Sequence, residues 1–147
     1  MNTHTIVTYS MGFAVSLDGG HVLLLEKGRP AFLKGQWIGV GGHIEEGETP
    51  LQAMVREAKE EADLDVNDWT YLDVVGQSET PGAPQNSALI HMFVAHTDLS
   101  CAQALTEERI AVFSWDQLDQ LPLAQSTRLI IEQVKSFALG SQRKYKL

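Results

Sequence analysis

The segment from residue 42 to residue 64, GHIEEGETPLQAMVREAKEEADL, constrains this chain more than any other. Its second half is predicted to be a helix that carries three glutamates, Glu57, Glu60 and Glu61. Residues three and four positions apart lie over one another on a helix surface, so these carboxylates repel one another. A divalent cation would turn that repulsion into binding energy, because hard cations such as Mg²⁺ take oxygen ligands.

The helix is predicted from its own residues. Thr49 and Gln52 fit a capping box, and Pro50 falls at the first helical position, where its missing N–H costs least. The residues expected on the buried face are Leu51, Met54, Val55, Ala58 and Ala62. At about 100° per residue, the three glutamates then fall on a different face from the apolar residues.

Glycines precede the helix in the run WIGVGG, as Gly39, Gly41 and Gly42. Glycine adopts backbone conformations that other residues avoid, and it lets a ligand approach the main chain. We therefore expect a glycine-rich turn leading into the acidic helix. Such a turn suits a site that holds a metal through carboxylates and a backbone carbonyl.

Strand-like patterns surround this segment, at 5–16, 21–27, 70–77, 88–97 and 109–115. A final helix is predicted from about 123 to 139, before Gly140. Its expected apolar stripe consists of Leu129, Ile130, Val134, Phe137 and Ala138. The basic tail 141–147 is expected to be flexible. This order of strands and helices favours mixed α/β layers.

The segment 42–64 resembles the Nudix box, whose pattern is G-x5-E-x7-R-E-U-x-E-E-x-G-U, with U a bulky apolar residue. The matching positions are Gly42, Glu48, Arg56, Glu57, Glu60, Glu61 and Leu64. Ala58 is small for an apolar position, and Asp63 replaces the second glycine, which ends the helix. Aspartate tolerates the left-handed conformation better than most residues, so we expect the loop to keep its shape.

The resemblance implies a Nudix α/β/α sandwich, with a mixed sheet between helices, over most of the chain. It also implies hydrolysis of a nucleoside diphosphate linked to another moiety, with Mg²⁺ or Mn²⁺ as cofactor. The implied metal ligands are Glu57, Glu60, Glu61, the Gly41 carbonyl and, from outside the box, Glu108 or Glu107. In some members the first of these acids, here Glu57, instead orients or deprotonates the water. Arg56 would hold the acids by charge-assisted hydrogen bonds, and Glu48 would be structural.

Substrate contacts are predicted from residues around the box. Arg29 and two neighbouring lysines could contact phosphates, or be solvated surface residues. Phe32 and Trp37 could stack on a base, although an aromatic residue beside a strand more often belongs to the core. His43 follows the glycines and could reach a phosphate or lie at the surface.

Three functions remain open. The run from Trp37 to Gly42 is similar to that of Nudix members that clean the nucleotide pool. It favours a pyrophosphohydrolase that converts a nucleoside triphosphate into a monophosphate and pyrophosphate. Pro81 lies near the position of a proline typical of ADP-ribose hydrolases, so a pyrophosphatase of ADP-ribose, dinucleotides or nucleotide sugars is the second candidate. The third is a non-catalytic nucleotide-binding domain.

The length and composition agree with one compact domain, which the resemblance implies is a single Nudix domain over residues 1–147. The net charge of −8 argues against nucleic-acid or anionic-membrane partners, whereas a bound cation would still let the protein hold a small nucleotide. The single cysteine, Cys101, excludes an internal disulfide. With no signal peptide or membrane span recognisable in the sequence, we expect a cytoplasmic monomer or homodimer.

Overall fold

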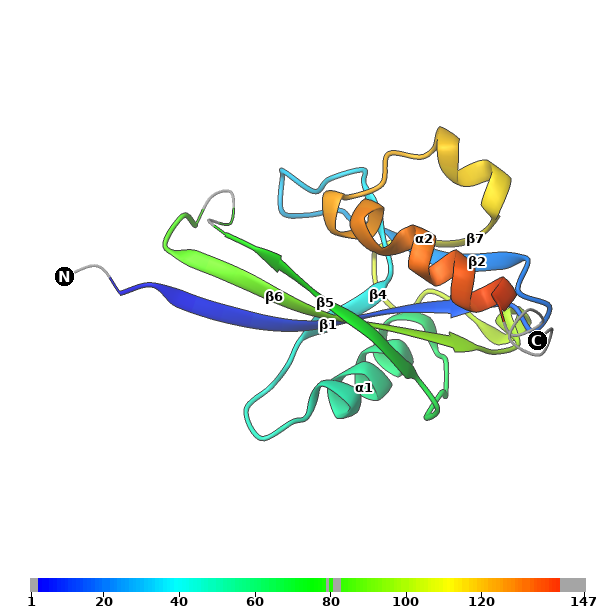
Figure 1. Ribbon diagram of the computed structural model, residues 1–147, viewed down its shortest axis with the longest axis horizontal. Coiled ribbons are helices and arrows are strands. Elements are labelled where there is room, and N and C mark those ends of the chain that lie inside the picture. The colour runs from blue at the N-terminus through cyan, green and yellow to red at the C-terminus, as the bar shows by residue number, and fades with distance from the viewer. Residues whose placement is uncertain (1–2, 79, 81–82, 141–147) are drawn as a thin grey trace.

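A seven-stranded mixed sheet forms the middle layer of the protein, with α1 on one face and α2 on the other (Figure 1). The computed structural model describes residues 3–78, 80 and 83–140. Pro81 and the basic tail 141–147 lie outside these residues. The elements are β1 (Thr5–Val15), β2 (His21–Glu26), β3 (Trp37–Ile38), β4 (Val40–His43), α1 (Pro50–Ala62), β5 (Thr70–Gln77), β6 (Asn86–His96), the 3₁₀ turn η1 (Leu99–Cys101), β7 (Ile110–Ser114), the 3₁₀ turn η2 (Trp115–Gln120) and α2 (Gln125–Gly140).

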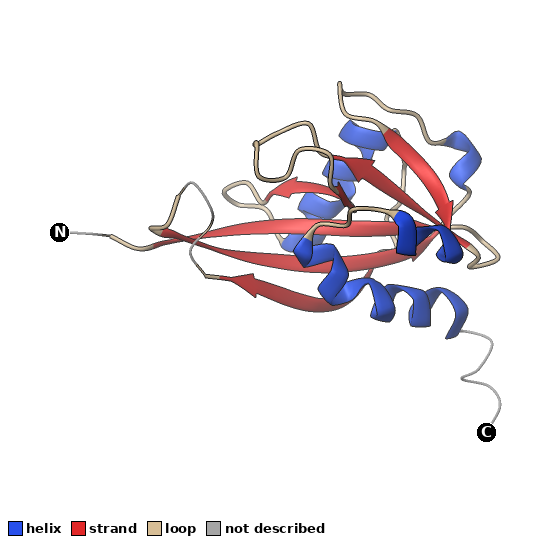
Figure 2. Ribbon diagram, turned by 90° about the horizontal axis from the view of Figure 1, so that it is seen from above, coloured by secondary structure: helices blue, strands red, loops and turns tan. Residues whose placement is uncertain are grey.

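The two long strands β1 and β6 run parallel at the centre of the sheet, and β5 pairs antiparallel with β6 at one edge. On the other side of β1, β4 and β2 pair with successive stretches of that strand, and β2 also pairs with β3 and β7 (Figure 2). Side chains alternate along β1, so they face the two helices in turn. The Ser10 hydroxyl donates to the Pro50 carbonyl of α1 at 2.7 Å. On the other face, the Thr127 hydroxyl of α2 lies 4.0 Å from the sulfur of Met11.

The expectation of a glycine-rich turn before the acidic helix is wrong, because most of that run forms β3 and β4. The glycines allow β4 to lie very close to β1. A Cβ on Gly39 would stand 2.5 Å from the Gly12 carbonyl oxygen, and one on Gly41 would overlap the Ser10 carbonyl oxygen. The glycines therefore bring the start of the box into the sheet.

Helix α1 begins and ends where the sequence predicts. Thr49 accepts a hydrogen bond from the Gln52 N–H at 3.1 Å, and the Gln52 side chain accepts one from the Thr49 N–H at 2.9 Å. Asp63 follows the last helical residue in the left-handed conformation, with φ 55° and ψ 35°. Leu51, expected on the buried face, is 42% exposed. Helical side chains lean toward the N-terminus, so a side chain in the first turn points past the end of the helix.

Helix α2 buries a narrower stripe than predicted. Its buried residues are Thr127, Ile130, Val134 and Ala138. Leu129 is 61% exposed, because it lies about 100° around the helix from Ile130 and outside the contact with the sheet.

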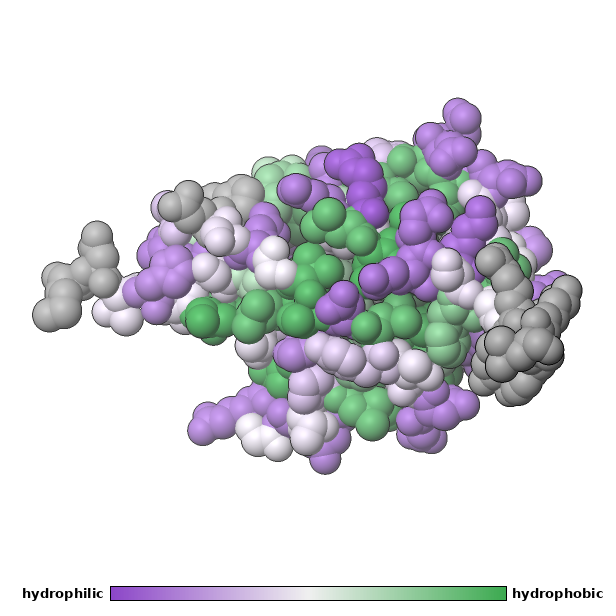
Figure 3. Space-filling view, viewed as in Figure 1, coloured by the Kyte–Doolittle hydropathy of each residue, from purple (hydrophilic) through white to green (hydrophobic). Residues whose placement is uncertain are grey.

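Hydrophobic residues also reach the surface in the middle of the face shown in Figure 3, near β5. Among the described residues, no helix is long and apolar enough to span a membrane.

Candidate active site

Arg56 organises the acidic face of α1. Its Nε and Nη2 donate to the two carboxylate oxygens of Glu48 at 2.8 and 2.9 Å. Its Nη1 donates to Glu57 at 2.9 Å and to Glu60 at 3.2 Å, and Nη2 also donates to the His43 carbonyl at 3.0 Å. Hydrogen bonds from Arg56 and from a backbone N–H hold the pKa of Glu48 at about 2. The two-pronged contact with Glu48 thus ties the loop before the helix to the helix itself.

Glu61 points from the helix to β4. Its carboxylate accepts a hydrogen bond from the Gly41 N–H at 2.7 Å. Burial raises the pKa of Glu61 to about 7; the charges of Glu57 and Glu108 add to the rise, whereas the Gly41 N–H and the Lys27 charge oppose it. In an extended strand the N–H and C=O of one residue point to the same side, so the Gly41 carbonyl also faces away from β1.

Glu57 is the second inward-facing acid. Its side chain is 14% exposed, and it lies directly against Gly42, where a Cβ would stand 2.6 Å from Oε1. Burial raises the pKa of Glu57, and the contact with Arg56 lowers it. The Glu60 side chain, by contrast, is 56% exposed and lies at the outer edge of the cluster. The structure therefore separates two enclosed carboxylates from one exposed carboxylate.

The enclosed acids have the donor chemistry of a divalent-cation site. Within residues 3–78, 80 and 83–140, no group of three or more acidic, histidine or cysteine side chains is arranged to hold a metal ion as it stands. Glu57 and Glu61 are nevertheless two carboxylates whose pKa values burial raises. Burying such charges is costly, and a cation with oxygen ligands would offset that cost. The residues present therefore fit a hard divalent cation.

A cleft with a volume of about 890 Å³ lies between the segments that follow β2 and precede β7. Two of its lining residues change the pKa of Glu61: the charge of Lys27 lowers it, and the charge of Glu108 raises it. Glu108 accepts a hydrogen bond from the Gly28 N–H at 2.6 Å and lies 3.5 Å from Lys27 Nζ. Arg29 also lines the cleft, with an exposed side chain. The cleft is large enough for a nucleotide-sized ligand.

The other residues predicted to bind substrate lie apart from the cleft lining. Phe32 is 41% exposed in the loop between β2 and β3. Trp37 is buried, with its ring edge-on to Phe113 at a centroid distance of 5.0 Å. The exposed His43 ring lies 4.6 Å from the Tyr9 ring. Their contacts with substrate stay predictions, and Trp37 is the residue whose ring is least accessible.

Arg109 lines the cleft but was not among the residues predicted to bind substrate. Its Nε donates to Glu26 at 2.9 Å, and its guanidinium lies 5.5 Å from the centroid of the Trp37 ring. The contact with Trp37 is a cation–π interaction. The sequence places Arg109 only at the start of a strand, because its partners are more than seventy positions away and meet it only in the folded sheet.

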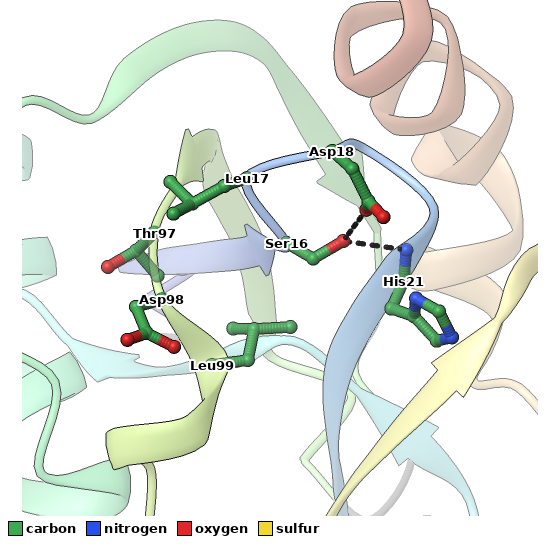
Figure 4. Close-up of a pocket in the computed structure, with 7 residues that line it drawn as sticks. All are labelled: Ser16, Leu17, Asp18, His21, Thr97, Asp98 and Leu99. Carbon is green, nitrogen blue, oxygen red and sulfur yellow. Dashed lines mark hydrogen bonds between the residues drawn. The ribbon is translucent and has the colours of Figure 1, made fainter.

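A second hollow, with a volume of about 300 Å³, lies where β1 and β6 end (Figure 4). The Ser16 hydroxyl donates to Asp18 at 2.7 Å and accepts a hydrogen bond from the His21 N–H at 3.0 Å. These polar groups stabilise the turn between β1 and β2. None of the predicted site residues lines this hollow.

Comparison with known proteins relates residues 8–135 to the family model of the NUDIX domain. A stretch of 55 residues is 38% identical to an 8-oxo-dGTP diphosphatase from Proteus vulgaris; it covers 37% of this chain and about half, 49%, of that relative. The MutT NUDIX hydrolase from Burkholderia pseudomallei is 25% identical, with a TM-score of 0.75 over 89% of this chain and 99% of that chain. The NUDIX domain of Shewanella oneidensis NrtR, solved with ADP ribose, shares the fold at 20% identity, with a TM-score of 0.73 over 92% of this chain and 89% of that chain.

Proposed function

The chain belongs to the Nudix hydrolase family, and we propose that it hydrolyses nucleoside triphosphates to a nucleoside monophosphate and pyrophosphate. One molecule of water adds across the phosphoanhydride bond in this reaction. The observation that carries the proposal is the enclosed carboxylate of Glu61, held by the Gly41 N–H and within electrostatic reach of Lys27 and Glu108, which line a cleft of mixed basic and acidic residues. A carboxylate in that position can bind a divalent cation that also binds the phosphates of the substrate.

We assign binding of Mg²⁺ or Mn²⁺ to Glu57, Glu60, Glu61 and the Gly41 carbonyl, with Glu108 as the further acid. A divalent cation bound there neutralises phosphate oxygens and makes water a better nucleophile. In the alternative assignment, Glu57, enclosed against Gly42, orients or deprotonates the attacking water instead of binding the metal.

Arg56 and Glu48 support these acids. The guanidinium of Arg56 holds the Glu57 carboxylate at 2.9 Å, and Glu48 fixes the guanidinium through two hydrogen bonds. Geometry of this kind matters because a catalytic group must be held in place before the substrate arrives. The role of Arg56 and Glu48 is therefore to position Glu57 and Glu60.

The basic residues of the cleft favour a polyphosphate ligand. Lys27, Arg29 and Lys34 come from one segment after β2 and line the same cleft. A protein with a net charge of −8 repels a free triphosphate at long range, so local cations are needed to bind it. The similarity to an 8-oxo-dGTP diphosphatase makes 8-oxo-dGTP the first substrate to test.

A substrate screen tests the proposal. The protein is incubated with Mg²⁺ and 8-oxo-dGTP, dGTP, ATP or ADP-ribose, and the products are separated by chromatography. We expect a monophosphate and pyrophosphate from a triphosphate, and no product when the metal is chelated. Preferential cleavage of ADP-ribose would instead support the second candidate, which the fold shared with the ADP-ribose-bound NUDIX domain suggests. Nucleotide binding without turnover would indicate a non-catalytic domain.

A further inference from the structure

The segment between η1 and β7 is attached to the C-terminal end of α1 by three hydrogen bonds. The Gln103 N–H donates to the Ala62 carbonyl at 3.0 Å, and the Leu105 N–H donates to the Glu61 carbonyl at 3.1 Å. The Gln103 side-chain amide donates to Asp63 Oδ2 at 3.2 Å. Carbonyl groups at the end of a helix lack partners within the helix, and this segment supplies them.

The same segment reaches the cleft a few residues later. Thr106, Glu107 and Glu108 belong to the lining of the cleft. Glu108 is fixed there by the Gly28 N–H at 2.6 Å. Residues 102–109 therefore connect the end of the acidic helix to one wall of the cleft. A displacement of this segment at Gln103 would be passed on to the wall.

Asp63 provides the side-chain contact in this connection. It stands where the Nudix pattern has glycine, and its φ of 55° is a conformation that glycine adopts without strain. One carboxylate oxygen accepts from Lys59 Nζ at 2.7 Å, and the other accepts from the Gln103 amide. Glycine would end the helix equally well but could make neither contact. The replacement therefore gives the helix end a link to the cleft segment that the family pattern does not provide.

We propose that Asp63 is a positioning residue that, through Gln103, fixes residues 102–109 and the cleft wall relative to the acidic helix. Lys59 holds the second oxygen of the carboxylate, one helical turn earlier. The kinetic consequences rest on the proposed hydrolase function. The contact itself can be measured without turnover, so a failure of the hydrolase proposal and a failure of this one give different results.

Amide hydrogen exchange of the peptide covering 102–109 tests the contact directly. Asp63→Gly and Gln103→Ala should each speed exchange there by about 3- to 10-fold, because one hydrogen bond that holds the segment is lost. Asp63→Asn keeps an acceptor for the Gln103 amide and should restore slow exchange. Lys59→Gln is the matched control, since it removes the ion pairs with Asp63 and Asp65 but keeps the hydrogen bond from the Gln103 amide, and should leave exchange unchanged. Unchanged exchange in both Asp63→Gly and Gln103→Ala would overturn the proposal, whatever the protein hydrolyses.

Steady-state kinetics on the best triphosphate of the screen supply the second readout. Asp63→Gly and Gln103→Ala should each lower kcat/KM by about 3- to 10-fold, and the double variant should lose no more than either single variant, because all three lack the same contact. Asp63→Asn should recover most of the loss. Losses that simply multiply in the double variant, or that follow a matching fall in melting temperature, would show that Asp63 acts only on stability.

Discussion

Replacing Gly42 with alanine should lower the activity and leave the stability of the protein nearly unchanged. A Cβ at this residue would lie 2.6 Å from Glu57 Oε1, whereas ordinary van der Waals contact begins near 3.4 Å. The Glu57 carboxylate must therefore move by about 0.8 Å in Gly42→Ala. Misplacing a catalytic group by about 1 Å costs on the order of 100-fold in rate. We therefore expect kcat/KM to fall by about 30- to 100-fold.

The stability of Gly42→Ala should change little. Glu57 is a flexible side chain that can turn away, and the loss of its contact with Arg56 costs about 0.5–1 kcal/mol of unfolding free energy. Alanine in a strand is about 0.5–1 kcal/mol better than glycine, which offsets that loss. The backbone at Gly42 has a conformation open to alanine, since it is not among the residues with positive φ.

The assay pairs kcat/KM for the best triphosphate with Mg²⁺ and the midpoint of urea unfolding. Gly76→Ala is the matched control, because its Cβ would meet only Leu89 Cδ2, at an ordinary distance of 3.6 Å. The control should keep both values near those of the parent protein. If Gly42→Ala turned over substrate at more than half the normal rate, the position of the Glu57 carboxylate would not matter for the reaction, and the reasoning would fail.

Three further predictions concern α1 and the residues that flank it. Glu61→Gln should lower turnover by about two orders of magnitude or more, since a ligand charge is lost, and the melting temperature without metal should be no lower than that of the parent protein, since a buried charge is removed; near-normal Mg²⁺-dependent turnover would refute the assignment. Asp63→Ala keeps the left-handed backbone but loses both contacts, so the midpoint of urea unfolding should fall further in Asp63→Ala than in Asp63→Gly, which loses the same contacts without the strain; equal falls would contradict the strain argument. The pKa of Glu48 is about 2 in the folded protein, below its ordinary value of 4.5, so its contribution to stability is complete above about pH 4.5 and disappears as the pH falls toward about 2. Glu48→Gln should flatten that part of the acid-unfolding curve, and a curve of unchanged shape would argue against the pair with Arg56.

The acidic helix could be predicted because its determinants are local. Thr49, Pro50 and Gln52 fix its start, and the spacing of Met54 and Ala58 sets its buried face. The long strands were predictable for a similar reason, since their apolar patterns are continuous along the chain. What such patterns cannot show is which strand lies next to which.

The glycines before the helix illustrate that limit. Gly39 and Gly41 look like turn residues, but they are required by the close approach of β4 to a strand about thirty positions earlier. The contact between Asp63 and Gln103 spans forty positions in the same way. Trp37 is buried for a related reason, since its ring contacts Phe113 of β7 and Arg109 just before that strand, both distant in sequence. Each of these contacts depends on the sheet order, which no local pattern contains.

The most direct test of the account is to follow phosphorus NMR of 8-oxo-dGTP and of the best unmodified triphosphate during incubation with Mg²⁺. The parent protein and Lys135→Gln, a substitution on the exposed face of α2, should both convert a triphosphate into a monophosphate and pyrophosphate in equal amounts. Glu61→Gln should show almost no conversion under the same conditions. The account would be contradicted if the parent protein bound these nucleotides and left them intact, or if Glu61→Gln released the same products at the same rate.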